Sequence, residues 1–259
     1  MITAGIDMGA KNIKVVLLQD GKVLAKSLVR GGFDTRESAE QCFREALNQA
    51  GIKEEDVSVV VSSGAGRKDA PYQKGTITEV SAASKAVLHL HPSARTVIDV
   101  GAEEGRAIRC DENGKVIDFA INEKCAAGAG AFTESMARAL EVELEEFGAL
   151  SLQSSADIPM NAQCAVFAES EVVSLVHAGT SKQDIARAVH DAIASRIVSL
   201  VRKVGFTPDV VLIGGVSNNV GFVDALNRGL ETRVTVAEDP DYMVALGAAL
   251  EAQALAGNA

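Results

Sequence analysis

The sequence contains no apolar run that approaches the ~18–20 residues needed to cross a membrane. Its first seven residues also lack the basic start that a secretory signal peptide places before its apolar core. Together, these two missing features lead us to expect a protein of the cytoplasm without a membrane partner.

Basic residues are too few for a nucleic-acid partner. The 259 residues include 25 Lys and Arg against 35 Asp and Glu, a net charge of −10, whereas a phosphate backbone is held by concentrated positive charge. A single nucleotide is not excluded, because a local pocket can bind it. The apolar content of 47% and the charged content of 23% are those of an ordinary globular chain.

Cysteine is scarce, and none of the four residues belongs to a CxxC pair. In a reducing cytoplasm, disulfides are not expected. Cys42 falls in an amphipathic helix pattern and Cys110 ends a strand-like run, so both are expected to be inert packing residues. Cys125 and Cys164 differ from them, because each stands where a helix pattern begins.

Low-complexity segments and long linkers are also missing, and helix and strand patterns alternate along the chain. This alternation predicts an α/β fold. Strand-like runs lie near 57–62 and 209–213. Helical patterns cover 35–50, 78–90, 129–147, 165–178, 181–204, 218–230 and 240–256.

What the sequence does contain is an internal repeat. Residues 5–10 (Gly-Ile-Asp-Met-Gly-Ala) are similar to residues 97–102 (Val-Ile-Asp-Val-Gly-Ala), and each run is followed by a strand pattern and an Asp-Gly or Asn-Gly hairpin turn. The offset is 92 residues at the first motif and 93 at the turn. The repeat predicts a duplicated fold with an N-terminal lobe at 1–94, joined by the helix at 240–256, and a C-terminal lobe at 95–239.

An Asp at the end of a strand, followed by a Gly turn, suits magnesium and phosphate. The carboxylate can hold Mg²⁺ directly or through water, and Gly lets backbone N–H groups approach phosphate oxygens. Either motif alone is more often a plain hairpin. Because Asp7 and Asp99 occupy matching positions in the two copies, we predict that they flank one nucleotide cleft.

A third motif lies at 210–219, where an apolar strand runs into Gly214 and Gly215 and then into a helix. Two glycines let a flat adenine or a ribose lie against the backbone. Following two Asp-x-Gly loops, this turn looks like the adenosine motif of the fold shared by sugar kinases, actin and heat-shock chaperones.

Cys125 and Cys164 are candidate ligands of a metal centre, because a helix N-terminus lowers the pKa of a thiol. Two thiolates are too few for zinc or a cubane cluster, so a second subunit would have to supply the other ligands. Two alternatives stay open: both cysteines are buried and unreactive, or one pairs with a histidine. The histidines show no local signature, and His177 and His190 are expected on polar helix faces.

The segments around both cysteines resemble a known family. Residues 122–132 (Asn-Glu-Lys-Cys-Ala-Ala-Gly-Ala-Gly-Ala-Phe) and 164–172 (Cys-Ala-Val-Phe-Ala-Glu-Ser-Glu-Val) look like the ATP-dependent activators of 2-hydroxyacyl-CoA dehydratases and the ATPase subunits of benzoyl-CoA reductase. The resemblance covers essentially the whole chain. It implies a dimer of homologous subunits that shares one [4Fe–4S] cluster, with two cysteines from each.

The same resemblance implies what such a dimer does. ATP hydrolysis would drive an electron, received from reduced ferredoxin or flavodoxin, to an acyl-CoA reductase or dehydratase. The first phosphate loop departs from the activators, since residues 9–14 read Gly-Ala-Lys-Asn-Ile-Lys where Ser or Thr usually follows Gly. The second loop, at 99–106, reads Asp-Val-Gly-Ala-Glu-Glu-Gly-Arg in place of Asp-x-Gly-Gly-Gln-Asp.

The second departure looks most like the delta-type subunit of class I benzoyl-CoA reductase. An electron-transfer subunit of that dearomatising enzyme is therefore the first functional expectation. An activator of a 2-hydroxyacyl-CoA dehydratase is the alternative. A sugar-type kinase and a chaperone-like ATP switch are more distant, because the chain shows neither a sugar-binding signature nor a peptide-binding domain.

The candidate site has three parts. The expected catalytic residues are Asp7, Asp99, Glu103 and Glu104, either glutamate as the group that positions the attacking water. Asp7 and Asp99 are also expected to hold Mg²⁺, and Cys125 and Cys164 the [4Fe–4S] cluster. The residues expected to bind ATP or ADP are Gly9, Ala10, Lys11, Asn12, Lys14, Gly101, Ala102, Gly128, Gly130, Gly214, Gly215 and Val216.

Overall fold

A computed structural model describes residues 1–122, 129–160 and 165–257 of the chain. The chain divides into two compact units. Unit 1 comprises Met1–Ser93, Cys110–Val116 and Asp241–Ala259, and unit 2 comprises Ala94–Arg109 and Ile117–Pro240. Unit 1 is thus assembled from both ends of the sequence together with one hairpin turn.

Unit 1 is built on a five-stranded sheet in the order β3-β2-β1-β4-β5. Strand β1 pairs antiparallel with β2 and parallel with β4. The β2–β3 hairpin turns at Asp20 and Gly21, which both have positive φ, as the Asp-Gly signal predicts. The strands are β1 (Ile2–Met8), β2 (Asn12–Gln19), β3 (Lys22–Arg30), β4 (Val57–Ser63) and β5 (Gly75–Thr76).

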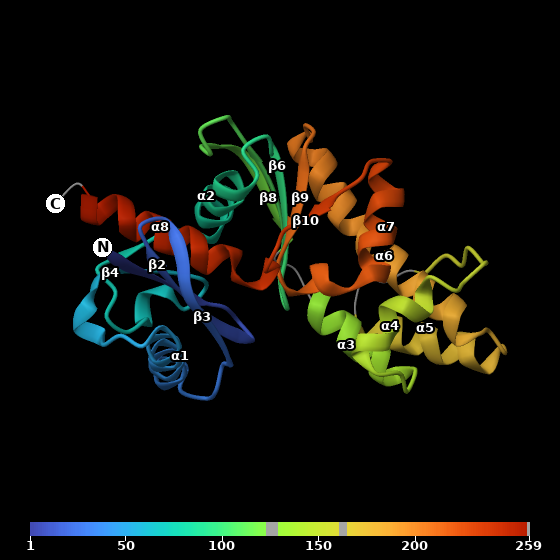
Figure 1. The fold of residues 1–259 in the computed structure, drawn as a ribbon. Coiled ribbons are helices and arrows are strands. Elements are labelled where there is room, and N and C mark those ends of the chain that lie inside the picture. The colour runs from blue at the N-terminus through green and yellow to red at the C-terminus, as the bar shows by residue number, and fades with distance from the viewer. Residues whose placement is uncertain (123–128, 161–164, 258–259) are drawn as a thin grey trace. The chain divides into compact units, whose positions relative to one another are not determined.

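Helices cover both faces of this sheet. On one face, α1 (Thr35–Ala50) packs its buried Phe43 against alternate residues of the strands, among them Ile6 and Ile13. On the other face lies α8 (Met243–Gly257), drawn in red beside the blue strands in Figure 1. A Cβ on Gly5 would stand 2.0 Å from the carbonyl oxygen of Ala245, so only glycine allows this approach of helix to strand.

Among its described residues, unit 1 also contains one more helix and two short 3₁₀ turns, and a third 3₁₀ turn crosses the boundary between the units. Helix α2 (Glu79–Leu90) packs on α8 so closely that a Cβ on Gly247 would stand 1.9 Å from the carbonyl oxygen of Ala82. The 3₁₀ turns are η1 (Glu54–Asp56), η2 (Arg67–Asp69) and η4 (Pro240–Tyr242), the last of which leads into α8.

Unit 2 repeats the same sheet. Its order β10-β9-β6-β7-β8 matches that of unit 1 read from the other edge, with β6 antiparallel to β7 and parallel to β9. The strands are β6 (Thr96–Val100), β7 (Gly105–Cys110), β8 (Val116–Asn122), β9 (Val210–Ile213) and β10 (Thr235–Val236). The predicted duplicated α/β fold is therefore confirmed.

Unit 2 carries more helix than unit 1. Its helices are α3 (Ala129–Ala139), α4 (Leu144–Ser151), α5 (Ala165–His177), α6 (Lys182–Val204) and α7 (Val220–Leu230), with the 3₁₀ turn η3 (Gly215–Asn218) before the last. The prediction of a single helix at 129–147 was wrong, because Glu141 takes a φ of +52° and ends α3. The helix predicted from 218 begins two residues later, where the Asn219 side chain accepts from two backbone N–H groups.

The core of unit 2 surrounds α6 and includes a buried histidine. The prediction that His190 lies on a polar helix face was wrong, since its side chain is 1% exposed. Its ring lies 4.9 Å from that of Phe147, and its Nδ1 is 2.6 Å from the carbonyl oxygen of Ala186. Burial lowers the pKa of His190 below its ordinary value of 6.5. By contrast, His177 is exposed as predicted.

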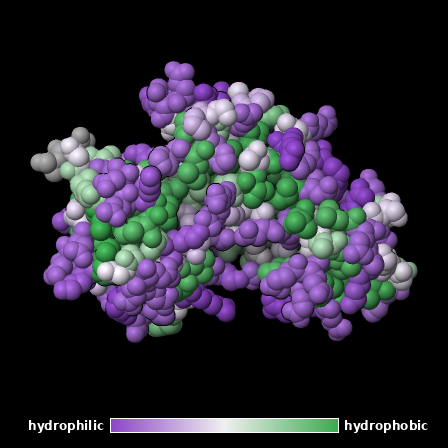
Figure 2. All heavy atoms as spheres, viewed as in Figure 1, coloured by the Kyte–Doolittle hydropathy of each residue, from purple (hydrophilic) through white to green (hydrophobic). Residues whose placement is uncertain are grey.

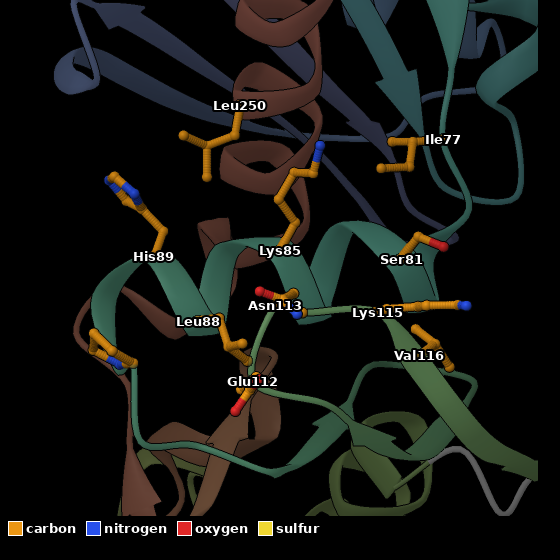
Figure 3. A pocket seen from close by; sticks show the side chains of 12 residues that line it. Ile77, Ser81, Lys85, Leu88, His89, Glu112, Asn113, Lys115, Val116 and Leu250 are labelled. Atoms are coloured by element: carbon orange, nitrogen blue, oxygen red, sulfur yellow. The ribbon is translucent and has the colours of Figure 1, made fainter.

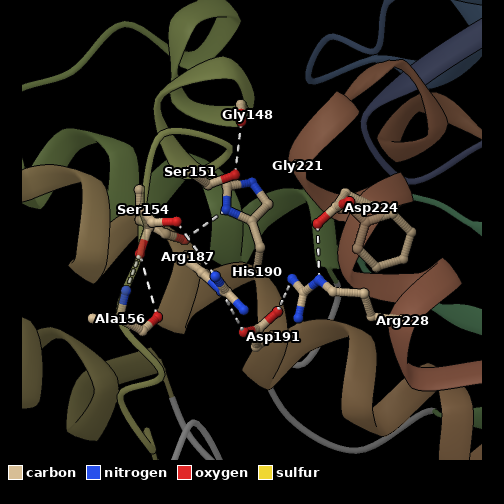
Figure 4. Close-up of polar contacts among 12 residues, drawn as sticks. Gly148, Ser151, Ser154, Ala156, Arg187, His190, Asp191, Gly221, Asp224 and Arg228 are labelled. Carbon is tan, nitrogen blue, oxygen red and sulfur yellow. Dashed lines mark hydrogen bonds and ion pairs between the residues drawn. The ribbon is translucent and has the colours of Figure 1, made fainter.

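Ion pairs join α6 to α7 at the surface near this histidine. The Arg228 guanidinium binds Asp191 of α6 and Asp224 of its own helix, at 2.5 and 2.9 Å (Figure 4). Hydrophilic residues predominate on the face shown in Figure 2, with apolar patches between them. None of the helices that the structure describes is both long and apolar enough to span a membrane.

Candidate functional site

The first predicted phosphate loop follows β1 in unit 1. Asp7 is the last residue but one of the strand and is almost fully buried. Its Oδ2 lies 3.0 Å from Nζ of Lys14, which stands directly opposite on β2. Lys14 was expected to contact phosphate, and in this structure it forms an ion pair with the candidate metal ligand.

Glycine is required at the start of this loop. A Cβ on Gly9 would stand 2.7 Å from the carbonyl oxygen of Asn12 and 3.2 Å from Nζ of Lys14. Ala10 is exposed at the tip, and the carbonyl of Lys11 accepts from the N–H of Gly31 at 2.8 Å. The loop therefore brings Gly9, Asn12 and Lys14 together beside Asp7.

The second predicted phosphate loop repeats this geometry in unit 2. Oδ2 of Asp99, at the end of β6, lies 2.9 Å from the Arg106 guanidinium directly opposite on β7. The same guanidinium also binds Glu104, and the N–H of Gly101 donates to the Glu104 carbonyl at 2.9 Å. Glu103 is exposed at the tip of the loop. Glu104 is therefore tied to Arg106, whereas Glu103 projects toward solvent.

The sequence motifs did not identify Arg106 as a partner of Asp99. The available signal was a basic residue seven positions after each repeated aspartate, Lys14 in one copy and Arg106 in the other. The ion pair links two neighbouring strands of the sheet.

The predicted nucleoside turn lies beside the second loop. Gly214 has a φ of +89°, and a Cβ on it would stand 2.4 Å from the carbonyl oxygen of Val100 and 2.8 Å from Oδ1 of Asp99. Gly215 is exposed and Val216 is buried. Unit 2 therefore brings the aspartate and the glycine turn together, in a cradle that a side chain on Gly214 would fill.

The second loop is also bonded to the first turn of α3. The N–H of Gly130 donates to the carbonyl of Gly101 at 3.2 Å, and the N–H of Ala131 donates to that of Ala102 at 2.9 Å. A Cβ on Gly130 would lie 2.9 Å from Cα of Ala102. A movement of this loop would therefore displace α3, the helix that follows Cys125 in the sequence.

The predicted cluster ligands Cys125 and Cys164 lie outside the described residues, as does Gly128. Within the described part of the chain, no group of three or more His, Cys, Asp or Glu side chains is arranged to hold a metal. Cys42 and Cys110 are buried, as expected of packing residues. Burial raises the pKa of the Cys42 thiol to about 11, so it stays protonated at neutral pH.

Unit 1 also holds a cavity of about 730 Å³ formed by α2, the β7–β8 turn and α8 (Figure 3). Lys85 and Leu88 of α2, the turn residues 112–116 and Leu250 of α8 line it. The lining also includes Glu112 and Lys115, so the cavity combines apolar walls with charges of both signs. Its lining includes none of the residues predicted for the nucleotide site.

Comparison with known proteins connects these features to a family. The model of the BadF/BadG/BcrA/BcrD ATPase family matches residues 4–252. The activator of lactoyl-CoA dehydratase from Anaerotignum propionicum is 41% identical over 253 residues, which cover 97% of each chain. A benzoyl-CoA reductase subunit from Thauera aromatica is 35% identical over 260 residues, which cover 96% of this chain and 92% of that protein.

Solved structures give the same result. Component A of the (R)-2-hydroxyglutaryl-CoA dehydratase of Acidaminococcus fermentans matches with a TM-score of 0.95 at 36% identity, over 99% of both chains. A ROK family glucokinase from Streptomyces griseus, 14% identical, matches with a TM-score of 0.61 over 98% of this chain and 100% of that one. The second match concerns the fold alone and confirms the predicted sugar-kinase type of fold. The sequence motifs, the family match and these relatives agree that the chain belongs to the BadF/BadG/BcrA/BcrD ATPase family.

Proposed function

We propose that this chain is an ATP-dependent activator that passes a low-potential electron to a 2-hydroxyacyl-CoA dehydratase. The observation that carries the proposal is the hydrogen bonding of the second phosphate loop to the first turn of α3. This contact joins a proposed phosphate-binding loop to the helix that follows the candidate cluster ligand Cys125 in the sequence. The 41% identity to a lactoyl-CoA dehydratase activator supports this choice of partner.

In this proposal each of the two lobes inferred from the sequence supplies one half of the nucleotide site. Asp7 from one and Asp99 from the other act on the magnesium and phosphate end of ATP. Both side chains offer carboxylate oxygens, which are the ligands that Mg²⁺ prefers. The loops at Gly9 and Gly101 offer backbone N–H groups to phosphate oxygens, and the turn from Gly214 to Val216 holds the nucleoside.

Of the two glutamates expected to position water, the structure favours Glu103. The carboxylate of Glu104 is occupied by Arg106, whereas Glu103 is exposed at the loop tip. The positioning of an attacking water needs a carboxylate that can accept its hydrogen bond. We propose that Glu103 has this role and that Glu104 holds the shape of the loop.

Cys125 and Cys164 are the proposed ligands of the [4Fe–4S] cluster. Each stands just before a helix, α3 or α5, and two thiolates per chain require a second, homologous subunit. When bound, the cluster would carry one electron between a reduced ferredoxin or flavodoxin and the acyl-CoA enzyme. The chain's own contribution is mechanical, because closure on ATP would move α3 through Gly101 and Ala102 as a rigid body. A reducing compartment such as the cytoplasm would suit both thiolates.

A benzoyl-CoA reductase component is the second candidate. The observation in its favour is the second phosphate loop, where Ala102, Glu103 and Glu104 depart from the sequence usual in activators. The Thauera aromatica reductase subunit is 35% identical to this chain. The two candidates share the ATP and cluster chemistry and differ in the partner enzyme.

The test is anaerobic purification followed by iron analysis and activation assays. We expect four irons per dimer, lost in Cys125→Ala and in Cys164→Ala but retained in the matched controls Cys42→Ala and Cys110→Ala. Nucleotide binding should survive in all four variants. Assays with a 2-hydroxyacyl-CoA dehydratase and with the substrate-binding subunits of a benzoyl-CoA reductase then identify the partner. A full complement of iron in the Cys164→Ala dimer would refute the cluster assignment.

A further inference from the structure

Ser63 is a buried hydroxyl that the proposed site does not yet use. It ends β4, its side chain is 0% exposed, and its Oγ finds no hydrogen-bond partner among the described residues. A buried hydroxyl without a partner is costly and uncommon in folded proteins. Its neighbour Ser62 is the opposite case, because its Oγ donates to the carbonyl of Arg67 at 2.7 Å.

The register of the sheet places Ser63 beside Asp7. The two residues are direct partners across the parallel pair β1–β4, so their side chains lie on the same face. Two residues earlier on each strand, Gly5 and Val61 lie on the face that α8 covers. Lys14 is the antiparallel partner of Asp7 on β2 and shares this face. One row across three strands therefore reads Lys14, Asp7, Ser63.

The fold itself does not require a hydroxyl at this position. Gly64, which follows Ser63, has a φ of +92°, and a Cβ on it would stand 2.4 Å from the carbonyl oxygen of Met8. In unit 2 the equivalent Gly214 has a φ of +89°, and a Cβ on it would likewise stand 2.4 Å from the carbonyl oxygen of Val100. The residue before that glycine is the apolar Ile213, which pairs in register with Asp99. The same turn thus forms with an apolar side chain.

We propose that Ser63 is a positioning residue for Asp7 in the nucleotide-bound state. In the structure described here, Asp7 is bound by Lys14. When a magnesium nucleotide enters, Lys14 turns to the phosphate oxygens and the Ser63 hydroxyl donates to the Asp7 carboxylate in its place. A neutral donor fixes the orientation of the carboxylate without cancelling its charge, and the charge stays available to the metal. This inference rests on the proposed function and deepens its metal site.

The experiment measures ADP affinity by calorimetry, with magnesium and with EDTA, together with the thermal midpoint of the nucleotide-free protein. Ser63→Val and Ser63→Thr introduce side chains of the same shape, but only threonine keeps the hydroxyl. We expect Ser63→Val to weaken magnesium–ADP binding by about 10-fold, as loss of an outer-shell partner does, and to leave binding in EDTA unchanged. Ser63→Thr should bind nearly as the parent does.

The control is Ser62→Ala, which removes a hydroxyl that is already satisfied. It should lower the thermal midpoint and leave magnesium–ADP affinity unchanged, whereas Ser63→Ala should not lower the midpoint, because its hydroxyl has no partner to lose. The inference would be overturned if Ser63→Ala and Ser63→Val both bound magnesium–ADP as tightly as the parent while Asp7→Asn bound it more weakly. Parental affinity in Asp7→Asn as well would instead overturn the proposed metal site itself.

Discussion

The two sheets share one strand order but hold their aspartates differently. In unit 1, Asp7 faces the single charge of Lys14, and a serine lies on its other side. In unit 2, Asp99 faces Arg106, whose planar guanidinium also holds Glu104. A guanidinium can bind two carboxylates at once, whereas an ammonium is a compact charge that moves easily. We infer that duplication preserved the backbone of the site and that its two halves then took different tasks, a rigid loop in unit 2 and an exchangeable cation in unit 1.

The largest expected effect tests whether both aspartates serve the same metal. Asp7→Asn and Asp99→Asn should each reduce ATP hydrolysis by about 10²-fold or more, because positioning by the metal carries most of phosphoryl-transfer catalysis. Steady-state phosphate release is the measurement. If only one of the two variants lost activity, the halves would not share the metal.

The glycine turns are the next comparison. Gly64→Ala and Gly214→Ala should each destabilise their own unit by about 2–4 kcal/mol, since the new Cβ combines left-handed strain with a 2.4 Å contact to a carbonyl oxygen. Hydrogen exchange read peptide by peptide separates the two units.

Two other glycines are matched controls for strain alone. Gly51 in unit 1 and Gly205 in unit 2 also have positive φ, but a Cβ on either meets nothing within 4 Å. Their alanine variants should cost only about 1–2 kcal/mol. Equal losses in all four variants would show that the close approach contributes nothing.

Acid should destabilise unit 2 more than unit 1, because the buried His190 belongs to unit 2. Its pKa is lowered in the folded state, so below pH 6.5 the unfolded chain takes up a proton that the folded chain does not. Unit 2 should therefore lose stability as pH falls from about 6.5, by at most about 1.4 kcal/mol per pH unit. Urea unfolding between pH 7.5 and 5 measures the slope. His190→Gln should remove it, and His89→Gln, at an exposed position of unit 1, should leave it intact.

The smallest expected effects concern helix caps. Asp34 begins α1 of unit 1 by accepting from the N–H groups of Arg36 and Glu37, and Ser181 begins α6 of unit 2 by accepting from that of Asp184. Replacement of either cap by alanine should cost about 1 kcal/mol, measured as a shift of the urea midpoint. Asp34→Ser keeps the hydrogen-bonding oxygen and should recover most of the loss.

Local sequence signals predicted much of the fold. The Asp-Gly turn at 20–21 and the matching Asn-Gly turn at 113–114 located both hairpins, because their geometry depends on a few adjacent residues. The apolar periods of α1, α5 and α6 gave those helices within one residue. Two predictions failed: Glu141 follows α3 at positive φ, which no sequence signal indicated, and His190 is covered by Phe147 from another helix.

Less of the candidate site than of the fold could be predicted from the sequence. The repeated Asp-x-Gly pattern identified both loops, but the pairing of Asp99 with Arg106 and the burial of Ser63 beside Asp7 depend on strand register. The repeated basic residue seven positions after each aspartate is a sequence signal for the first pair, but nothing adjacent in the sequence links Ser63 to Asp7, because a whole helix separates their strands. The roles of Cys125 and Cys164 stay predictions.

Helix α8 makes the folding of unit 1 depend on residues that are synthesised late. The first strands leave the ribosome early, yet one face of their sheet is covered by residues 243–257. Until those residues are synthesised, Gly5 and Val61 have no helix to pack against, and an apolar strand surface stays exposed. Unit 2 ends at Pro240, so it does not include the residues of α8. Unit 1 therefore depends on residues that are synthesised after all of unit 2, and a nascent chain that stalls before residue 243 would present chaperones with an uncovered sheet.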